Sequence, residues 1–252
     1  MNRTKQLTAV ALTMILGACA SKPQQPVAFN PGAIAGSANR VVIDMKNIPE
    51  TNTSFPGASC LLCIGVARAA HSDLSTHVQT LEAEELSFLP GRLAQALSRN
   101  GALAKVLDNP VDIESLSDNP AKGDNPKLAK KDFRPLAEEL GADKLLVVNI
   151  HSQGVLRPYS AYIPVDVPKA HVSGIAYMVD LRSNTYLWYT TVSTAKPAEG
   201  AWNEPPNFPG LTNAYYQVLA ETSDLLVSEL TNDAKTSSRG SSLTTAKTEV
   251  TQ

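Results

Sequence analysis

The sequence has no strong charge of either sign and few aromatic residues. Its 252 residues include 22 basic and 24 acidic side chains, a net charge of -2, and only 6% are aromatic. A nucleic-acid binder carries a basic surplus gathered on one face, so we expect no nucleic-acid partner. The 43% of hydrophobic residues is typical of a chain that folds, and this length suits one sizeable domain with appendages.

The sequence also lacks the short motifs that mark common catalytic sites. It has no Gly-x-Ser-x-Gly elbow, no glycine-rich phosphate loop and no His-Glu-x-x-His zinc motif. The string Ser-Thr-Ala-Lys at residues 193–196 imitates a fragment of the penicillin-binding serine enzymes, but it lies at the end of an expected strand and not at the start of a helix. We therefore expect no enzymatic activity, no cofactor and no metal.

One apolar run stands at the start of the chain. Arg3 and Lys5 precede residues 7–17, which are apolar except for two threonines. A basic start followed by a short apolar stretch is the layout of a secretory signal peptide. The stretch is shorter than the roughly 20 apolar residues that cross a bilayer as a helix. The chain is therefore expected to be exported.

The next residues, Leu16-Gly17-Ala18-Cys19, resemble the lipobox of bacterial lipoproteins. The resemblance implies that residues 1–18 are removed as a signal peptide and that acylated Cys19 anchors the protein in lipid. Ala20 stands where an aspartate signals retention in the inner membrane, so the resemblance implies the outer membrane, with the body of the protein in the periplasm. The alternative is an ordinary secretory signal in which the cysteine has no role.

Composition divides the rest of the chain into three parts. Residues 19–39 are rich in Pro, Gln, Ala and Gly without a period, which predicts a flexible tether. Residues 233–252 are crowded with Ser, Thr and Lys, which predicts a disordered tail. A single folded α/β domain is expected over residues 40–232.

A second apolar segment covers residues 58–70 (ASCLLCIGVARAA) and is interrupted by Arg68. It too is shorter than a membrane span. We expect it to be buried in the protein, and a short loop that dips into a membrane is the alternative.

Hydrophobic periodicity predicts a mixed α/β fold. Apolar and β-branched runs predict strands at residues 41–45, 104–107 and 145–150, and a hairpin of two longer strands at 171–181 and 185–194. Leucines four residues apart predict a helix that begins near Ser87, with Pro90 in its first turn. A short helix is expected at 133–140, ended by Gly141, and a long final helix capped by Thr212. The expected architecture is a mixed sheet of about five strands, with a C-terminal antiparallel hairpin, packed by about three helices.

This order of elements, together with the string Leu140-Gly141-Ala142-Asp143 leading into a strand, resembles an α/β domain of cell-envelope lipoproteins. The families are the CsgG group, the LpoB-type synthase activators and the N-terminal domain of the periplasmic protein TolB. The resemblance covers residues 40–232, and this chain departs from it by insertions at 47–82 and 152–170. It implies a non-catalytic protein that serves assembly, secretion or synthase activation by binding an envelope protein or its own copies.

Cys60 and Cys63 are three positions apart and admit three interpretations. Outside the cytoplasm two such cysteines form a local disulfide, which is the interpretation we adopt. The alternatives are two reduced thiols buried in an apolar segment and a thiol–disulfide exchange site. His71 and His77 follow in the order of a zinc site, although His71 comes too soon after Cys63 for a zinc finger. The second function we consider is therefore a periplasmic thiol–disulfide or metal-binding protein that uses this cysteine pair.

Two proline-rich loops carry the remaining candidate residues. Tyr159 and Tyr162 lie in one loop, and Trp202 and Phe208 lie in the other. Proline lowers the conformational cost of presenting a loop, and aromatic side chains are common interface anchors. We expect these four residues to bind a partner, either an envelope protein or a second copy of the chain. The alternative is that their rings seal the edge of the sheet and the start of the last helix.

Overall fold

The computed structural model describes residues 23–35, 39–121, 123–204 and 207–231. The predicted signal peptide, Cys19 and the predicted tail therefore lie outside the described residues. In chain order the elements are η1 (Pro31–Ala33), β1 (Arg40–Met45), β2 (Asn52–Ser54), α2 (Leu61–Ala70), α3 (Ser72–Gln79), α4 (Glu84–Arg99), β3 (Leu103–Val106), η2 (Ile113–Ser115), α5 (Leu136–Glu139), β4 (Lys144–Leu156), β5 (Tyr159–Ser160), β6 (Ile163–Pro164), β7 (Lys169–Asp180), β8 (Thr185–Pro197) and α6 (Pro209–Thr231).

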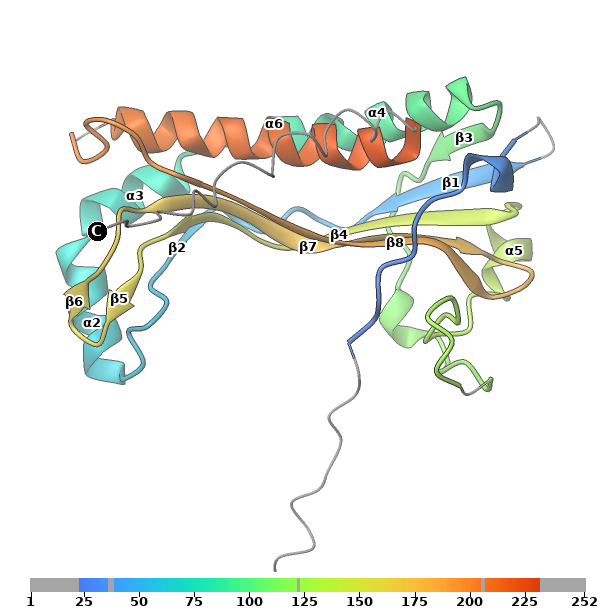
Figure 1. The fold of residues 1–252 in the computed structure, drawn as a ribbon, viewed down its shortest axis with the longest axis horizontal. Helices are drawn as coiled ribbons and strands as arrows, with labels where there is room; N and C mark the ends of the chain where they lie inside the picture. Colours follow the sequence, from blue (N-terminus) through green and yellow to red (C-terminus); the bar gives the residue numbers. More distant parts are fainter. Residues whose placement is uncertain (1–22, 36–38, 122, 205–206, 232–252) are drawn as a thin grey trace, which may run out of the picture.

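A mixed sheet forms the centre of the molecule (Figure 1). Its main strand order is β3-β1-β4-β7-β8, and β2 pairs with the C-terminal end of β4. β1 is parallel to β3 and β4, whereas β4, β7 and β8 are antiparallel neighbours. The expected class, a mixed sheet with a C-terminal antiparallel hairpin, is confirmed. Asn184 closes the hairpin with φ of 56°, in the left-handed region that asparagine tolerates.

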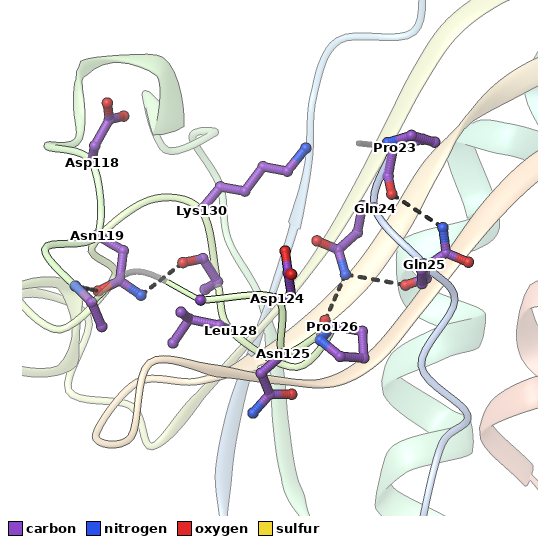
Figure 2. A pocket seen from close by; sticks show the side chains of 13 residues that line it. Pro23, Gln24, Gln25, Asp118, Asn119, Asp124, Asn125, Pro126, Leu128 and Lys130 are labelled. Carbon is purple, nitrogen blue, oxygen red and sulfur yellow. Dashed lines mark hydrogen bonds between the residues drawn. The ribbon is translucent and has the colours of Figure 1, made fainter. Parts of the chain in front are cut away.

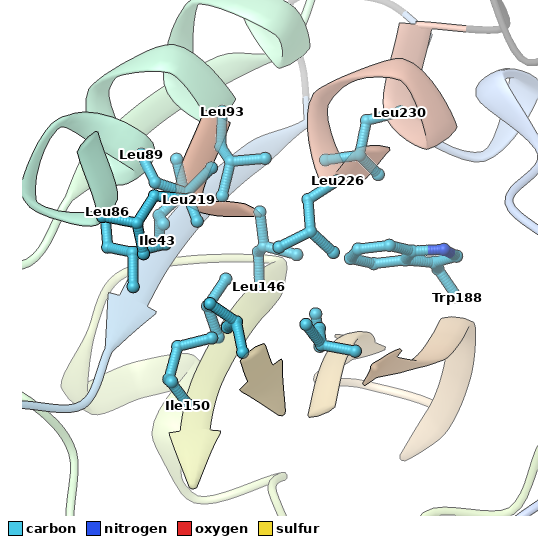
Figure 3. Packing of buried hydrophobic residues seen from close by; sticks show 14 of the residues in the cluster. Ile43, Leu86, Leu89, Leu93, Leu146, Ile150, Trp188, Leu219, Leu226 and Leu230 are labelled. Carbon is cyan, nitrogen blue, oxygen red and sulfur yellow. The ribbon is translucent and has the colours of Figure 1, made fainter. Parts of the chain in front are cut away.

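α4 and α6 cover one face of this sheet (Figure 1). The leucines that form the expected apolar face of α4, Leu89, Leu93 and Leu97, are fully buried. Figure 3 shows leucines of both helices in one cluster with Trp188 of β8. Trp188 also donates from Nε1 to Oε2 of Glu229 on α6 at 2.8 Å. Burial of these side chains provides the main stabilisation of the helix layer on the sheet.

α4 begins at Glu84, earlier than the predicted start near Ser87. As a result, Pro90 lies inside the helix and not in its first turn. A proline inside a helix costs about 3 kcal/mol, because it removes one hydrogen bond and crowds the preceding turn. The additional turn buries Leu86 completely, which contributes roughly 1.5–3 kcal/mol. Packing of Leu86 therefore offsets much of the cost of the proline.

α6 also begins earlier than expected, at Pro209. Thr212, predicted as the cap, lies inside the helix, where its hydroxyl donates to the carbonyl of Asn207 at 3.0 Å. Proline at the first helical position is favourable, because its fixed φ suits the helix and its missing N–H has no partner there. The prediction of Thr212 as a cap is therefore wrong, although the helix itself is confirmed.

The other face of the sheet is covered at one end by the chain between β3 and β4 (Figure 1). There Phe133 and Leu136 pack in a second hydrophobic cluster with Leu145 of β4. α5 is shorter than the helix expected at 133–140. Gly141 ends it in the left-handed region, with φ of 58°, as predicted.

The first described residues cross the edge of the sheet instead of standing away from it. Val27 and Tyr189 of β8 exchange two backbone hydrogen bonds of 2.9 Å. Val27 is buried, and Ile34 is completely buried in the cluster beneath α4 and α6. Residues 23–35, expected to be part of the flexible tether, thus belong to the folded unit. Only residues 20–22 remain between Cys19 and this unit.

Asp143 joins β1 to the start of β4 and gives the fold a pH dependence. Its carboxylate accepts hydrogen bonds from the guanidinium Nε of Arg40 at 3.1 Å and from the backbone N–H of Arg40 at 3.0 Å. These bonds lower the pKa of Asp143 from 3.8 to about 2. Because the folded-state pKa lies below the unfolded one, this stabilisation is complete above about pH 4 and is lost as the pH falls towards 2.

We therefore expect the free energy of unfolding to decrease between about pH 4 and pH 2, and to decrease less in the variant Asp143→Asn. Urea denaturation of both proteins at several pH values across this window measures the difference. Parallel pH profiles for the two proteins would show that Asp143 does not contribute.

Candidate functional site

Among the described residues, most of the large apolar side chains that are exposed gather at one end of the molecule. Leu61 is 92% exposed, and Leu62 and Ile163 are each 67% exposed. We call this surface the apolar tip, and it consists of Leu61, Leu62, Val66, Tyr162, Ile163 and Val165. In Figure 1 the tip, formed by α2 and the β5–β6 hairpin, projects away from the layer of α4 and α6. The expectation that residues 58–70 are buried in the protein is wrong for these side chains of α2.

The tip is exposed because α2 turns its small residues towards the protein. Cys63 and Ala67, one helical turn apart, are buried in a small cluster with Tyr159. The larger Leu62 and Val66 lie on the outward side of the same helix. Leu62 and Val66 therefore face solvent, while Ile64 packs partly against the small cluster.

Tyr159 is the centre of this small cluster. Its ring packs edge-on against Phe55 and His71, with centroids 5.9 Å apart in each case. Its backbone N–H donates to the carbonyl of Pro56 at 2.8 Å. Gly57 follows with φ of 89°, and a side chain there would collide with the carbonyl of Tyr159. Contacts between two segments far apart in the sequence thus hold the tip in place.

Cys60 and Cys63 lie at disulfide distance at the start of α2, with Cα atoms 5.0 Å apart. Cys60 is the N-cap of the helix, and its sulfur accepts the backbone N–H of Cys63 at 2.9 Å. The hydroxyl oxygen of Tyr162 lies 3.7 Å from the same sulfur. The geometry matches the disulfide interpretation and places the bond between the two halves of the apolar tip.

The two histidines of the zinc hypothesis make other contacts. His71 stacks on Phe55 with centroids 6.0 Å apart, and Nε2 of His77 lies 2.7 Å from the hydroxyl of Thr212. Burial lowers the pKa of both histidines. Among the described residues, no three side chains of His, Cys, Asp or Glu group closely enough to hold a metal ion. The structure therefore does not bring Cys60, Cys63, His71 and His77 together as a donor set.

Two of the four aromatic residues predicted to bind a partner are buried. Tyr159 and Phe208 are each only 6% exposed, and Phe208 packs with Leu74 beneath the start of α6. For these two residues the alternative interpretation is correct, because their rings fill hydrophobic clusters and do not reach the surface. Tyr162 is 49% exposed and Trp202 is partly exposed, so both remain candidates for binding.

Trp202 lies beside a buried cation at the base of the tip. The guanidinium carbon of Arg157 is 5.3 Å from the centroid of the indole, within the range of a cation–π interaction. Burial lowers the pKa of Arg157, but arginine stays charged at neutral pH. Burial and the nearby charge of Arg157 both lower the pKa of His71, which favours its neutral form. The base of the tip therefore carries a permanent positive charge.

The sequence did not predict one polar contact on the sheet, between Ser152 and His171. The hydroxyl of Ser152 on β4 lies 3.1 Å from Nε2 of His171 on β7 and 2.8 Å from the hydroxyl of Ser173. A serine beside a histidine is one part of a nucleophilic site, which also requires a group that orients the imidazole. Among the described residues, no carboxylate shifts the pKa of His171, which burial lowers and a hydrogen bond with the backbone of Gly154 raises. The pairing of β4 with β7 brings these residues together, so no local sequence motif predicts their contact.

A surface cavity of about 610 Å³ lies between the N-terminal segment and the loop at residues 118–130 (Figure 2). Gln24 bridges its two sides, because its Nε2 donates to the carbonyl of Pro126 at 2.6 Å. Asp124 and Lys130 line it along with amide side chains, and none of the described lining residues is a serine, histidine or cysteine. We therefore assign this cavity to the packing of the N-terminal segment on the domain.

No protein-family model matches the chain, and no curated protein matches it. Similar solved structures include protein XCC0632 of Xanthomonas campestris, from family model DUF330, with a TM-score of 0.40 and 13% identity over 84% of this chain and 95% of that one. Lipoprotein GNA1162 of Neisseria meningitidis has a TM-score of 0.26 and 15% identity over 73% of this chain and 99% of that one. The PelC dodecamer of Paraburkholderia phytofirmans has a TM-score of 0.30 and 13% identity over 79% of this chain and 95% of that one.

The similar structures thus include a lipoprotein of a Gram-negative bacterium. At this degree of likeness they do not assign a function. The resemblance to the CsgG, LpoB and TolB domains stays a prediction.

Proposed function

We propose that the protein is a non-catalytic, lipid-anchored protein of the outer membrane that faces the periplasm and works by binding. The observation that carries this proposal is the apolar tip, where large apolar side chains stand in solvent on a folded domain. An extended exposed apolar surface is typical of an interaction site. The titratable pair that most resembles catalytic machinery, Ser152 and His171, has no orienting carboxylate among the described residues.

The anchor is assigned to Cys19, which the lipobox resemblance makes the acylated first residue of the mature chain. One acyl chain gives only marginal membrane binding, whereas two or more give stable attachment. Ala20 supports the outer membrane by the same resemblance. None of the helices within residues 23–231 that the structure describes is long and apolar enough to span a membrane.

The proposed partner is an envelope protein or a second copy of the chain. Two of the predicted anchor residues are accessible in the structure. They are Tyr162 and Trp202, and the ring of Trp202 contacts Arg157. Aromatic residues backed by arginine are common among the residues that dominate binding energy.

Site-specific photo-crosslinking in living cells tests this proposal. A photoreactive amino acid at position 202 is expected to yield a defined crosslinked product, and one at position 162 shows whether the tip takes part in the same contact. The matched control is Phe88, which is 65% exposed on α4, an element that forms no part of the tip, and is expected to yield none. Failure to recover any partner or any second copy from positions 202 and 162 would argue against a binding function.

The second candidate function is thiol–disulfide exchange at Cys60 and Cys63. The observation in its favour is their position, because Cys60 is exposed at the N-terminus of α2 while Cys63 is buried. A helix N-terminus stabilises a thiolate, which is the reactive form of cysteine.

Thiol labelling separates a structural disulfide from an exchange site. In the acylated protein we expect a maleimide tag on no cysteine before reduction and on Cys60 and Cys63 after full reduction, because a disulfide leaves no free thiol. Mass spectrometry of the tagged protein reads out both states. A pair that a glutathione buffer alone reduces would favour exchange, since structural disulfides resist this buffer.

A further inference from the structure

We propose that the apolar tip enters the lipid surface that holds the acyl chains of Cys19. This inference rests on the lipid anchor of the proposed function and assigns a second, protein-based contact with the same membrane. Its occupant is thus a phospholipid surface, whereas the protein partner or second copy of the proposed function binds at Trp202, beside Arg157 at the base of the tip.

The chemistry of the tip suits the boundary between lipid headgroups and acyl chains. Leu61, Leu62 and Val66 stand in solvent on α2, and Arg68 is the only charged residue of that helix. A helix with one apolar side and a basic residue is typical of elements that lie in a membrane interface. Tyr162, half exposed beside them, has the apolar ring and polar hydroxyl that favour the headgroup region.

The charge of the tip is complementary to anionic lipids. The two segments that build it, residues 55–70 and 157–169, contain three basic side chains, Arg68, Arg157 and Lys169. Asp166 is their one acidic residue and forms an ion pair with Lys169 at 2.7 Å. Three positive charges against one negative leave a surplus of two on segments of a chain whose overall charge is -2. A basic surplus beside exposed apolar residues strengthens attraction to negatively charged headgroups.

The start of the folded unit places the tip near the membrane. The four residues 19–22 span at most about 14 Å when fully extended, so an acylated Cys19 keeps Pro23 close to the lipid. Pro23 itself is fixed to the body, because Gln24 bonds to Pro126 and Val27 pairs with Tyr189. In Figure 1 this segment leaves the sheet on the side away from α4 and α6, and the tip projects on the same side.

The shape of the tip also favours a lipid surface. α2 and the β5–β6 hairpin project from the end of the sheet as a free end of the molecule (Figure 1). Leu62 and Val66 belong to the outward side of α2, while Cys63 and Ala67 complete its contact with the protein. A projecting apolar end can enter a bilayer without any complementary groove in a partner.

Fluorescence quenching by brominated phospholipids tests the inference on the full acylated chain. The protein is reconstituted into vesicles of zwitterionic and anionic phospholipid, with or without bromine on the acyl chains. Leu62→Trp and Ile163→Trp each place an indole on the tip, and Phe88→Trp places one on α4 as the matched control. Trp188 and Trp202 supply a constant background that the unsubstituted protein measures.

We expect the bromine to remove most of the fluorescence added at positions 62 and 163 and to leave the fluorescence added at position 88 unchanged. Flotation of each variant with the vesicles reports the acyl anchor separately. A protein that floats but shows no selective quenching at the tip overturns this inference and leaves the anchor intact. A protein that does not float overturns both. An unquenched indole at position 62 whose emission shifts to the blue as the protein concentration rises would assign the tip to a second copy.

Discussion

The variant Cys19→Ser is expected to lose stable attachment to the outer membrane. Serine has no thiol to receive a lipid, so the variant would keep its leader and carry no acyl chain. A single acyl chain gives a membrane association constant of only about 10⁴ M⁻¹, and each further chain multiplies this constant. Removing all of the acyl chains therefore lowers the membrane association constant by several orders of magnitude. The measurement is metabolic labelling with an alkyne fatty acid, followed by separation of outer membranes from the other fractions.

The double variant Cys60→Ser with Cys63→Ser is the matched control for this experiment. It removes the other two cysteines of the chain, which the structure pairs with each other. We expect it to keep both the fatty-acid label and the outer-membrane location. A labelled Cys19→Ser variant in outer membranes would place the anchor elsewhere.

The variant Trp188→Ala is expected to destabilise the domain by about 3–5 kcal/mol. Trp188 is 1% exposed between β8 and α6, so its removal leaves a cavity in the main cluster. It also removes the donor that binds Glu229 at 2.8 Å. This loss is a large part of the 5–15 kcal/mol by which most domains are stable. Urea denaturation, followed by far-UV circular dichroism, measures it.

Trp202→Ala is the matched control, because the same side chain is lost from a partly exposed position. We expect a destabilisation of about 1–2 kcal/mol, from the cation–π contact with Arg157 and partial burial. Equal losses for the two variants would contradict the packing of α6 on β8 described above.

The centre of the fold could be predicted because its signals are local. The apolar run at 145–150 and the aromatic and β-branched residues on either side of Asn184 predict strands whatever the rest of the chain does. α4 was predicted from the spacing of Leu89, Leu93 and Leu97, but its true start depends on the burial of Leu86 against the sheet. No local pattern contains that contact.

The tip could not be predicted for a similar reason. An apolar run such as residues 58–70 is typical of a buried segment, and only contact with Tyr159 decides which side of α2 faces the protein. Tyr159 and Phe208 look like exposed loop aromatics in the sequence, because their partners come from distant segments. Val27 and Ile34 lie in a composition typical of a linker, although each fills a place in the core.

The most direct test of the central claim, a lipid anchor at residue 19, is the intact mass of the protein extracted from outer membranes. We predict a mature chain that begins at Cys19 and carries the added mass of its acyl chains. We also predict that protease digestion places all of that mass on the N-terminal peptide. A chain that retains residues 1–18, or one that starts elsewhere without acyl mass, would contradict the account.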